Sequence, residues 1–300
     1  MGNLRTVIYH EFPIGFSIAR LNLWLDTQEW GQQLTLPQAH EKFLNSRENR
    51  SPAEGDLCLK LSPHSLPTNH AENTLICKTK IWELWQNPSG NYVFIAPQGA
   101  HPRGAVINPR FQNGVVYSDQ SLSSQHNDYP LQALDNIIFV NWLGTFADII
   151  LHASGAVIED NGYAFIGPAG AGKSTLVNAL QQAVPSEVLG EDQVVLRFLE
   201  QRFWIYGTPW HENPALCSAV GAPLAKLFYL DRDPTKPASC TRLKPPAAVQ
   251  RILQTAFIPY YRKDLVPGIL DRLTRLVEQV PCYVLNFRLG TDPWNLVQSC

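Results

Sequence analysis

The chain has 300 residues, of which 45% are hydrophobic and 17% are charged. This composition is sufficient for a buried core, and it excludes a disordered chain or a small scaffold held together by disulfides. With 24 Lys and Arg against 26 Asp and Glu, the net charge of −2 provides no positive field for nucleic acid or an anionic membrane. We therefore expect no nucleic-acid partner. The length favours two domains of roughly 150 residues each.

Cysteine usage and hydropathy favour a cytoplasmic protein without a membrane span. The six cysteines form no C-x-x-C pair and no zinc-ligand spacing with histidine, so we expect reduced thiols, which are typical of a cytoplasm. They are Cys58, Cys77, Cys217, Cys240, Cys282 and Cys300. The most apolar stretch, residues 137–158, is interrupted by Asn141, Asp148 and His152, whereas a bilayer span needs about 20 residues with few or no charges.

Residues 1–130 have the pattern of a β-rich domain, whose role the sequence does not disclose. Short runs of β-forming residues alternate with turn residues. The predicted strands cover residues 56–61, 92–95, 103–107 and 115–117, and Asn-Pro-Ser-Gly at 87–90 predicts a turn.

Residues 131–300 alternate helical and strand patterns, which indicates an α/β domain. A helix over 131–150 is predicted by side chains at helical spacing, namely Leu134, Ile138, Trp142, Thr145 and Ile149. A strand over 152–158, an Asp160-Asn161-Gly162 turn and a strand over 163–166 predict a hairpin, because Asn-Gly between apolar runs is a strong hairpin signal.

The remaining pattern continues the alternation. It predicts helices over 173–183, 245–256 and 265–280, strands over 187–189, 193–198, 202–206, 225–230 and 282–287, and a short final helix from Pro293.

The stretch after the hairpin satisfies the phosphate-binding pattern G-x-x-x-x-G-K-[ST]. Its residues are Gly167, Pro168, Ala169, Gly170, Ala171, Gly172, Lys173 and Ser174. A chain with this composition would contain roughly 0.004 such matches by chance. An apolar strand precedes the pattern and a helix-forming run follows it, as in a P-loop, so the sequence predicts binding of a nucleoside triphosphate.

The residue types of this loop suit phosphate chemistry. Glycines let backbone N–H groups point inward as an anion nest, and the start of the following helix adds to the positive potential. We expect Lys173 to reach the β- and γ-phosphates, the Ser174 hydroxyl to coordinate Mg²⁺, and Thr175 to hold the α-phosphate. The predicted ligands are ATP and Mg²⁺.

Two classes of P-loop protein are disfavoured by missing motifs. A GTPase should carry an N/T-K-x-D guanine motif and a D-x-x-G switch, and the chain has neither in the required place. A transporter-type ATPase should carry an L-S-G-G-Q-like signature, which is also missing. A compact kinase is the remaining class.

Several motifs together resemble those of the HPr kinase/phosphorylase family, and more closely HPr-kinase-like proteins. The resemblance covers roughly residues 131–290. It rests on the His152-Ala153-Ser154 strand, the hairpin, the P-loop, Glu191-Asp192, Gly207-Thr208-Pro209-Trp210-His211 and the strand over 222–230. It implies an α/β P-loop core of HPr-kinase/PEP-carboxykinase-like type in residues 131–300, with residues 1–130 as a variable β-rich N-terminal region.

The resemblance also implies roles for individual residues. His152 would lie near the γ-phosphate, Glu191 would be the base that takes the proton of the acceptor hydroxyl, and Asp192 would support Mg²⁺ beside Ser174. Lys173 keeps its role at the phosphates. Independently of the family, phosphoryl transfer needs positioning, charge neutralisation and a carboxylate beside the acceptor hydroxyl.

Two departures from the family pattern affect the substrate and the base. The family usually has Asp where this chain has Glu191, and the E-[IV]-R-G-type signature of true HPr kinases is missing. The acceptor is therefore left open as a serine of a protein, a peptide or a small hydroxyl compound.

Two further residues have alternative interpretations. Asp231 ends the apolar run 227–230 and is a rival metal ligand. We prefer Asp192 because its strand directly follows the P-loop helix and is expected to lie beside the P-loop strand. His211 is either a site residue or part of a rigid loop.

The sequence thus predicts a cytoplasmic, ATP-dependent phosphotransferase acting on a hydroxyl group. The alternative is a nucleotide-binding regulatory or scaffold protein with little or no kinase turnover. A homo-oligomer is compatible with the sequence.

Overall fold

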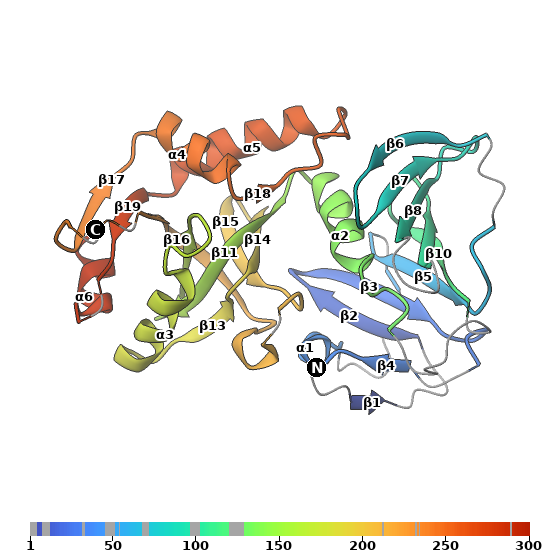
Figure 1. The fold of residues 1–300 in the computed structure, drawn as a ribbon, viewed down its shortest axis with the longest axis horizontal. Coiled ribbons are helices and arrows are strands. Elements are labelled where there is room, and N and C mark those ends of the chain that lie inside the picture. Colours follow the sequence, from blue (N-terminus) through green and yellow to red (C-terminus); the bar gives the residue numbers. More distant parts are fainter. Residues whose placement is uncertain are drawn as a thin grey trace. The chain divides into compact units, whose positions relative to one another are not determined.

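The computed structural model shows a mixed α/β protein with two large sheets and short helices (Figure 1). It describes residues 5–7, 13–31, 34–45, 52–53, 55–67, 72–96, 103–119, 129–211, 213–231, 233, 235–288 and 290–300. The chain divides into two compact units, Met1–Trp142 and Leu143–Cys300. Within the described parts of the chain, no helix has the length and apolar character needed to cross a bilayer.

The N-terminal unit is built on an eight-stranded sheet with the order β2-β3-β5-β10-β9-β8-β7-β6. The strands are β2 (Ile14–Ile18), β3 (Leu21–Asp26), β5 (Leu57–Ser62), β6 (Thr74–Lys78), β7 (Glu83–Gln86), β8 (Tyr92–Ala96), β9 (Arg103–Ile107) and β10 (Asn113–Ser118). A separate pair, β1 (Arg5–Val7) and β4 (Leu34–Leu36), and the helices α1 (Gln38–Glu41) and α2 (Asp135–Gly144) complete the elements up to residue 144.

The strands predicted in this unit are confirmed as β5, β8, β9 and β10, with ends that differ by up to two residues. The predicted turn joins β7 to β8. In it the Gly90 N–H donates to the Asn87 carbonyl oxygen (2.8 Å), and Gly90 has a φ of +82°. A positive φ is the conformation that glycine adopts at little cost.

The helix predicted over 131–150 is too long: α2 ends at Gly144, and Ile149 already lies in a strand. Asp148 explains the difference. Its carboxylate accepts hydrogen bonds from Arg197 Nε (2.8 Å) and from the Phe198 backbone N–H (3.0 Å). These contacts draw the chain out of the helix, a tertiary effect that overrides the local helical periodicity.

The C-terminal unit contains a nine-stranded sheet in which five strands form a closed ring. The path β12-β11-β14-β15-β16 closes because β16 also pairs with β12 in parallel. The strands are β11 (Ile149–Ile158), β12 (Asn161–Ile166), β13 (Glu187–Gly190), β14 (Gln193–Leu199), β15 (Arg202–Gly207), β16 (Gly221–Leu230), β17 (Ser239–Arg242), β18 (Ala256–Phe257) and β19 (Cys282–Asn286).

Helices cover two faces of these strands (Figure 1). They are α3 (Lys173–Ala183), α4 (Pro245–Leu253), α5 (Val266–Gln279) and α6 (Pro293–Gln298), with a 3₁₀ turn at Pro214–Leu216. Phe165 of β12 packs in a core with α3 and α6, whereas its neighbours Ala164 and Ile166 pack in a core with α4 and α5. This is the alternation that a pleated strand imposes.

Most elements predicted after residue 150 are confirmed, including α3 with both of its ends. The helix predicted over 245–256 is too long, because α4 ends at Leu253 and β18 begins at Ala256. There the Thr255 hydroxyl and N–H both donate to the Ile252 carbonyl oxygen, and the Thr255 carbonyl accepts from the His152 N–H.

The hairpin formed by β11 and β12 is confirmed, but its predicted turn residues are wrong. The corner is Glu159-Asp160, with φ angles of +50° and +60°, and Asn161 already pairs with Ile158. Two left-handed residues in succession make the type I′ turn that matches strand twist.

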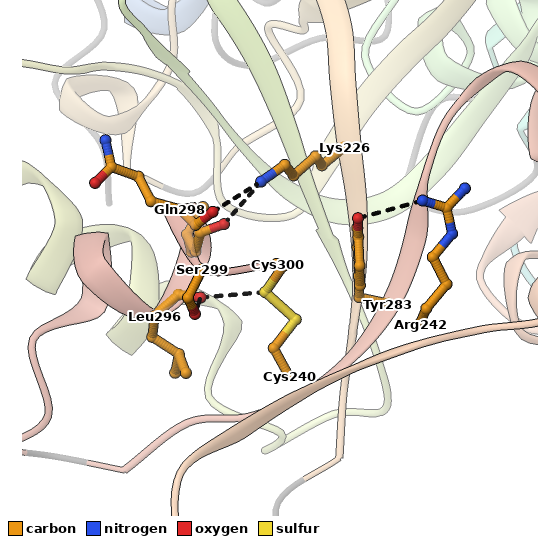
Figure 2. Close-up of a disulfide and its surroundings, with 9 residues drawn as sticks. Lys226, Cys240, Arg242, Tyr283, Leu296, Gln298, Ser299 and Cys300 are labelled. Carbon is orange, nitrogen blue, oxygen red and sulfur yellow. Dashed lines mark hydrogen bonds between the residues drawn. A yellow bond between two sulfur atoms is a disulfide. The ribbon is translucent and has the colours of Figure 1, made fainter.

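The expectation that all six cysteines are reduced is contradicted by a disulfide between Cys240 and Cys300 (Figure 2). It joins β17 to the residue that follows the last turn of α6, and the two residues are 60 positions apart. Lys226 Nζ supports the same helix end by donating to the carbonyl oxygens of Val297 (3.1 Å) and Gln298 (3.4 Å). No short spacing marks a pair so distant in sequence. Cys58, Cys77, Cys217 and Cys282 are free thiols.

We predict that Cys240→Ser lowers the free energy of unfolding by about 2–4 kcal/mol, because a disulfide across this interval restricts the unfolded chain. Urea denaturation with and without a reducing agent measures the effect. Cys77→Ser, which removes a free thiol, is the control and should unfold as the wild type does. An unfolding midpoint of the wild type that ignores the reducing agent would contradict the prediction.

Candidate functional site

The glycine-rich loop Gly167–Gly172 connects β12 to α3, in the strand–loop–helix context predicted from the sequence. Gly167 has a φ of +152°, Gly170 of +76° and Gly172 of +94°. These are values that other residues adopt only with strain, so the spacing of the three glycines determines the path of the loop.

Lys173 folds back over this loop. Its side chain is buried, and Nζ donates to the carbonyl oxygens of Gly167 (3.0 Å) and Pro168 (3.3 Å). Burial lowers the pKa of the Lys173 ammonium, and the negative charge of Asp192 opposes this shift. A desolvated cation held by neutral carbonyls would gain free energy from a nearby anion.

The first turn of α3 adds backbone donors to this cation. Gly172 is the N-cap of α3 and has no side chain that could accept a hydrogen bond from the helix start. The Leu176 N–H donates to the Gly172 carbonyl oxygen (2.9 Å). The N–H groups before Leu176 therefore lie where a helix start binds anions. Ser174 is half-buried and Thr175 is exposed in this turn.

The carboxylate pair Glu191-Asp192 is the two-residue link between β13 and β14, which both pair with β11. Two hydrogen bonds from β11 hold the backbone of this link. Ser154 Oγ donates to the Glu191 carbonyl oxygen (2.8 Å), and the Ala153 N–H donates to that of Asp192 (3.1 Å).

His152 also contacts the link. Its Nδ1 lies 2.9 Å from the Asp192 carbonyl oxygen, which can only accept, so Nδ1 carries a proton and donates. The structure thus brings His152 to the acidic pair through the backbone.

The same stretch of β11 borders the glycine-rich loop. Ala153 pairs with Ile166, the last residue before the loop, on the edge of β11 opposite to the edge that faces the link. β12 pairs with this edge as far as Ala153. Beyond that residue β18 pairs with the same edge, and the His152 N–H donates to the Thr255 carbonyl oxygen. Residues 152–154 therefore separate the loop from the acidic pair by the width of one strand.

The two carboxylates differ in their surroundings. Glu191 is half-buried. Burial raises the pKa of the Glu191 carboxyl, the Asp192 charge raises it further, and the polar side chain of Asn178 acts in the opposite direction. The Asp192 side chain is 51% exposed, and its charge acts on Lys173.

His211 packs against the backbone of Gly190 and Asp192. Its Nδ1 accepts from the Asp192 N–H (3.4 Å), and its Nε2 lies 3.2 Å from Thr208 Oγ1, which itself donates to the Gln193 carbonyl oxygen (3.0 Å). The hydroxyl proton is thus used, so Nε2 donates to Thr208. The imidazole lies close against Gly190, because a Cβ atom there would be 2.4 Å from Nε2.

The expected neighbour of the P-loop strand is corrected by the sheet order. β14 and β13 pair with β11, whereas β16, the strand before Asp231, pairs directly with β12 and matches Tyr229 to Ile166. The Asp231 charge acts on Lys236, and the Asp192 charge acts on Lys173. The topological reason for preferring Asp192 was wrong: the strand that pairs with β12 is the one before Asp231, and Leu230 lies close against Gly167.

Sequence reasoning gave no role to three polar residues of this region, Asn178, Ser154 and Thr208. Asn178 lies four residues after Ser174 and so shares its helix face. Ser154 lies two residues after His152 and so shares its strand face. Thr208 lies three residues before His211 in the 207–211 stretch.

The donor set fits Mg²⁺ bound together with a nucleotide. Among the described residues, no three His, Cys, Asp or Glu side chains cluster as a metal site. The Ser174 hydroxyl and the Asp192 carboxylate are hard oxygen donors. Mg²⁺ is usually held by only one or two such groups, with water and phosphate oxygens providing the others.

No known family model matches the sequence, and no curated protein does. The structure is similar to the Hpr(Ser) kinase/phosphatase from Coxiella burnetii, with a TM-score of 0.32 and 14% sequence identity over 50% of this chain and 88% of that chain.

We predict that Gly190→Ala lowers the free energy of unfolding by about 1–3 kcal/mol, because the added methyl group would lie 2.4 Å from His211 Nε2 and 2.9 Å from the Gln193 carbonyl oxygen. The loss should be partly relieved in Gly190→Ala combined with His211→Ala, measured by urea denaturation. Gly268→Ala is the control: its added Cβ would meet only Ala147 Cβ at 3.6 Å. Strictly additive losses in the double variant would contradict the packing argument.

Proposed function

We propose that this protein is an ATP-dependent phosphotransferase that transfers the γ-phosphoryl group to a hydroxyl group of a protein, peptide or small molecule. One observation carries the proposal. The glycine-rich loop with the buried Lys173 and the Glu191-Asp192 link lie at opposite edges of β11, next to residues 152–155. A cation within a loop that suits phosphate, and a carboxylate that suits an acceptor hydroxyl, thus lie on either side of one strand.

The loop side of the site would bind the triphosphate. Residues Gly167–Thr175 would surround it with backbone N–H groups, and Lys173 would exchange the Gly167 and Pro168 carbonyls for phosphate oxygens. Ser174 and Asp192 would hold Mg²⁺, which when bound neutralises charge on the phosphate oxygens.

The acidic side of the site would receive the acceptor. The acceptor oxygen forms a bond to the γ-phosphorus, the bond from that phosphorus to the bridging oxygen of ADP breaks, and the hydroxyl proton passes to the Glu191 carboxylate. His152, fixed through Nδ1, would present Nε2 toward the γ-phosphate. The residues mainly position the reactants and balance their charge.

We predict that Lys173→Ala weakens ATP binding by about 10- to 100-fold, the range expected for a charge-assisted contact. Titration calorimetry with ATP and GTP, with and without Mg²⁺, measures this. Removing Mg²⁺ should weaken nucleotide binding by the wild type. If the wild type binds no nucleotide, the proposed function is wrong.

We predict that Glu191→Gln keeps ATP affinity within about twofold and lowers turnover by at least about 100-fold, because the amide cannot accept the proton. Phosphorus NMR detects ADP in the presence of serine peptides and hydroxyl metabolites. Turnover equal to that of the wild type would contradict the role of Glu191. Tight ATP binding by the wild type without turnover on any acceptor would favour a regulatory or scaffold protein.

A further inference from the structure

His211 is a buried histidine whose two ring nitrogens both take part in hydrogen bonds. Its side chain is 2% exposed. Nδ1 accepts from the Asp192 N–H (3.4 Å), and Nε2 donates to Thr208 Oγ1 (3.2 Å), which in turn donates to the Gln193 carbonyl oxygen (3.0 Å). This chain of hydrogen bonds therefore begins and ends on two neighbouring residues, where the acidic link enters β14.

Thr208 determines which nitrogen of His211 carries the proton. The Thr208 side chain is buried and its hydroxyl proton is donated to Gln193, so toward the imidazole it can only accept. The ring proton is therefore on Nε2, and Nδ1 keeps a lone pair. That lone pair accepts from the Asp192 N–H but offers no proton to the Asp192 carboxylate, whose Oδ2 lies 4.0 Å from Nδ1. The carboxylate thus remains available to a cation.

The backbone of Asp192 is held by imidazoles at both of its polar groups. His152 Nδ1 and the Ala153 N–H donate to its carbonyl oxygen (2.9 and 3.1 Å), and His211 accepts from its N–H. The ring of His211 is itself held in place against Gly190, where a Cβ atom would be 2.4 Å from Nε2. An aspartate with a fixed backbone has two rotatable side-chain bonds left, so these contacts limit where its carboxylate can lie.

We propose that His211 is a positioning residue that orients Asp192 as a ligand of nucleotide-bound Mg²⁺. Loss of a group that orients a metal ligand typically lowers metal affinity by roughly 10- to 100-fold. This inference rests on the proposed function, in which Asp192 and Ser174 hold Mg²⁺. It gives His211 no contact with ATP or with the metal, so loss of His211 should weaken the effect of Mg²⁺ on ATP binding and spare ATP binding without Mg²⁺.

Two substitutions separate this role from a structural one, because each keeps a different half of the imidazole. His211→Asn places Oδ1 where Nδ1 lies, so it can still accept from the Asp192 N–H, but it does not reach Thr208. His211→Gln extends an amide to the position of Nε2 and can still donate to Thr208, but it has a carbon where an acceptor for Asp192 is needed. A merely structural account expects similar losses in both variants, whereas the positioning role expects only His211→Gln to lose the Mg²⁺ effect.

The test measures the Kd for ATP of the full chain by titration calorimetry, with and without Mg²⁺, and takes the ratio of the two values. His211→Gln should lower this ratio about tenfold, and His211→Asn should stay within about twofold of the wild type. The Kd without Mg²⁺ should stay within about twofold in both, which also shows that they fold. His64→Gln makes the same substitution at an exposed histidine and should match the wild type.

Thr208 offers a second route to the same test. Thr208→Val removes the hydroxyl that keeps the ring proton on Nε2, so it should lower the ratio, and Thr208→Ser keeps the hydroxyl and should preserve it. These two variants decide the question if His211→Gln does not fold. Equal ratios in Thr208→Val and Thr208→Ser would then overturn the inference.

A double-variant cycle tests whether His211 acts through Asp192. Asp192→Asn removes the carboxylate, so adding His211→Gln to it should change the ratio by less than about twofold. A full tenfold loss in that background would overturn the inference. So would an unchanged ratio in His211→Gln, or equal losses in His211→Gln and His211→Asn.

The binding readout keeps the failure of this inference distinct from the failure of the proposed function. A wild type that binds no nucleotide would overturn both. A wild type that binds ATP more tightly with Mg²⁺ but makes no ADP would overturn the proposed transfer alone, and lower ratios confined to His211→Gln would still support the role of His211. An active wild type with an unaffected His211→Gln would overturn the inference alone.

Discussion

The hydrogen-bond register of β11 is the constraint on which the candidate site depends. On one edge of this strand β12 ends opposite Ala153, and on the other edge β13 ends opposite Gly155 and β14 begins opposite His152. Both interruptions fall within the same four residues. The glycine-rich loop leaves one edge there, and the Glu191-Asp192 link crosses the other. A shift of one residue would turn every side chain of β11 to the opposite face, so His152 and Ser154 could no longer reach the link.

Burial around β11 fixes this register. Leu151 and Ala153 pack with α4 and α5, while Ala156 and Ile158 pack with α3, and all four are fully or almost fully buried. The register shift between Gly155 and Ala156 lies where the strand passes from one core to the other. A strand held on both faces is a rigid support, and rigid supports give functional side chains more precise positions than loops do.

Local sequence signals predicted most helices and strands. The features that they did not predict depend on contacts between residues far apart in the sequence. The ends of α3 followed from the glycine-rich pattern before it and the helix-forming run after it, all within a few residues. The end of α2 depends on Asp148 meeting Arg197, 49 positions away, and the disulfide joins residues 60 positions apart. Neither contact can be inferred from a short stretch of sequence around one of its partners. The pairing of β16 with β12 is likewise a matter of sheet order, which is why the expected neighbour of the P-loop strand was wrong although both strands were predicted.

The sheet order leaves the loop between two acids, Asp192 across β11 and Asp231 after β16, and the position of Lys173 distinguishes them. A charge interaction weakens with distance and with exposure to water. Asp192 influences the pKa of the buried Lys173 ammonium, whereas the Asp231 charge acts on Lys236 and the Asp231 N–H is tied to the Leu285 carbonyl (3.1 Å). Ser174 directly follows Lys173 in the chain. The charge of Asp192 therefore acts on the ammonium that precedes Ser174, although Asp231 follows the strand that pairs with β12 and Leu230 lies close against Gly167.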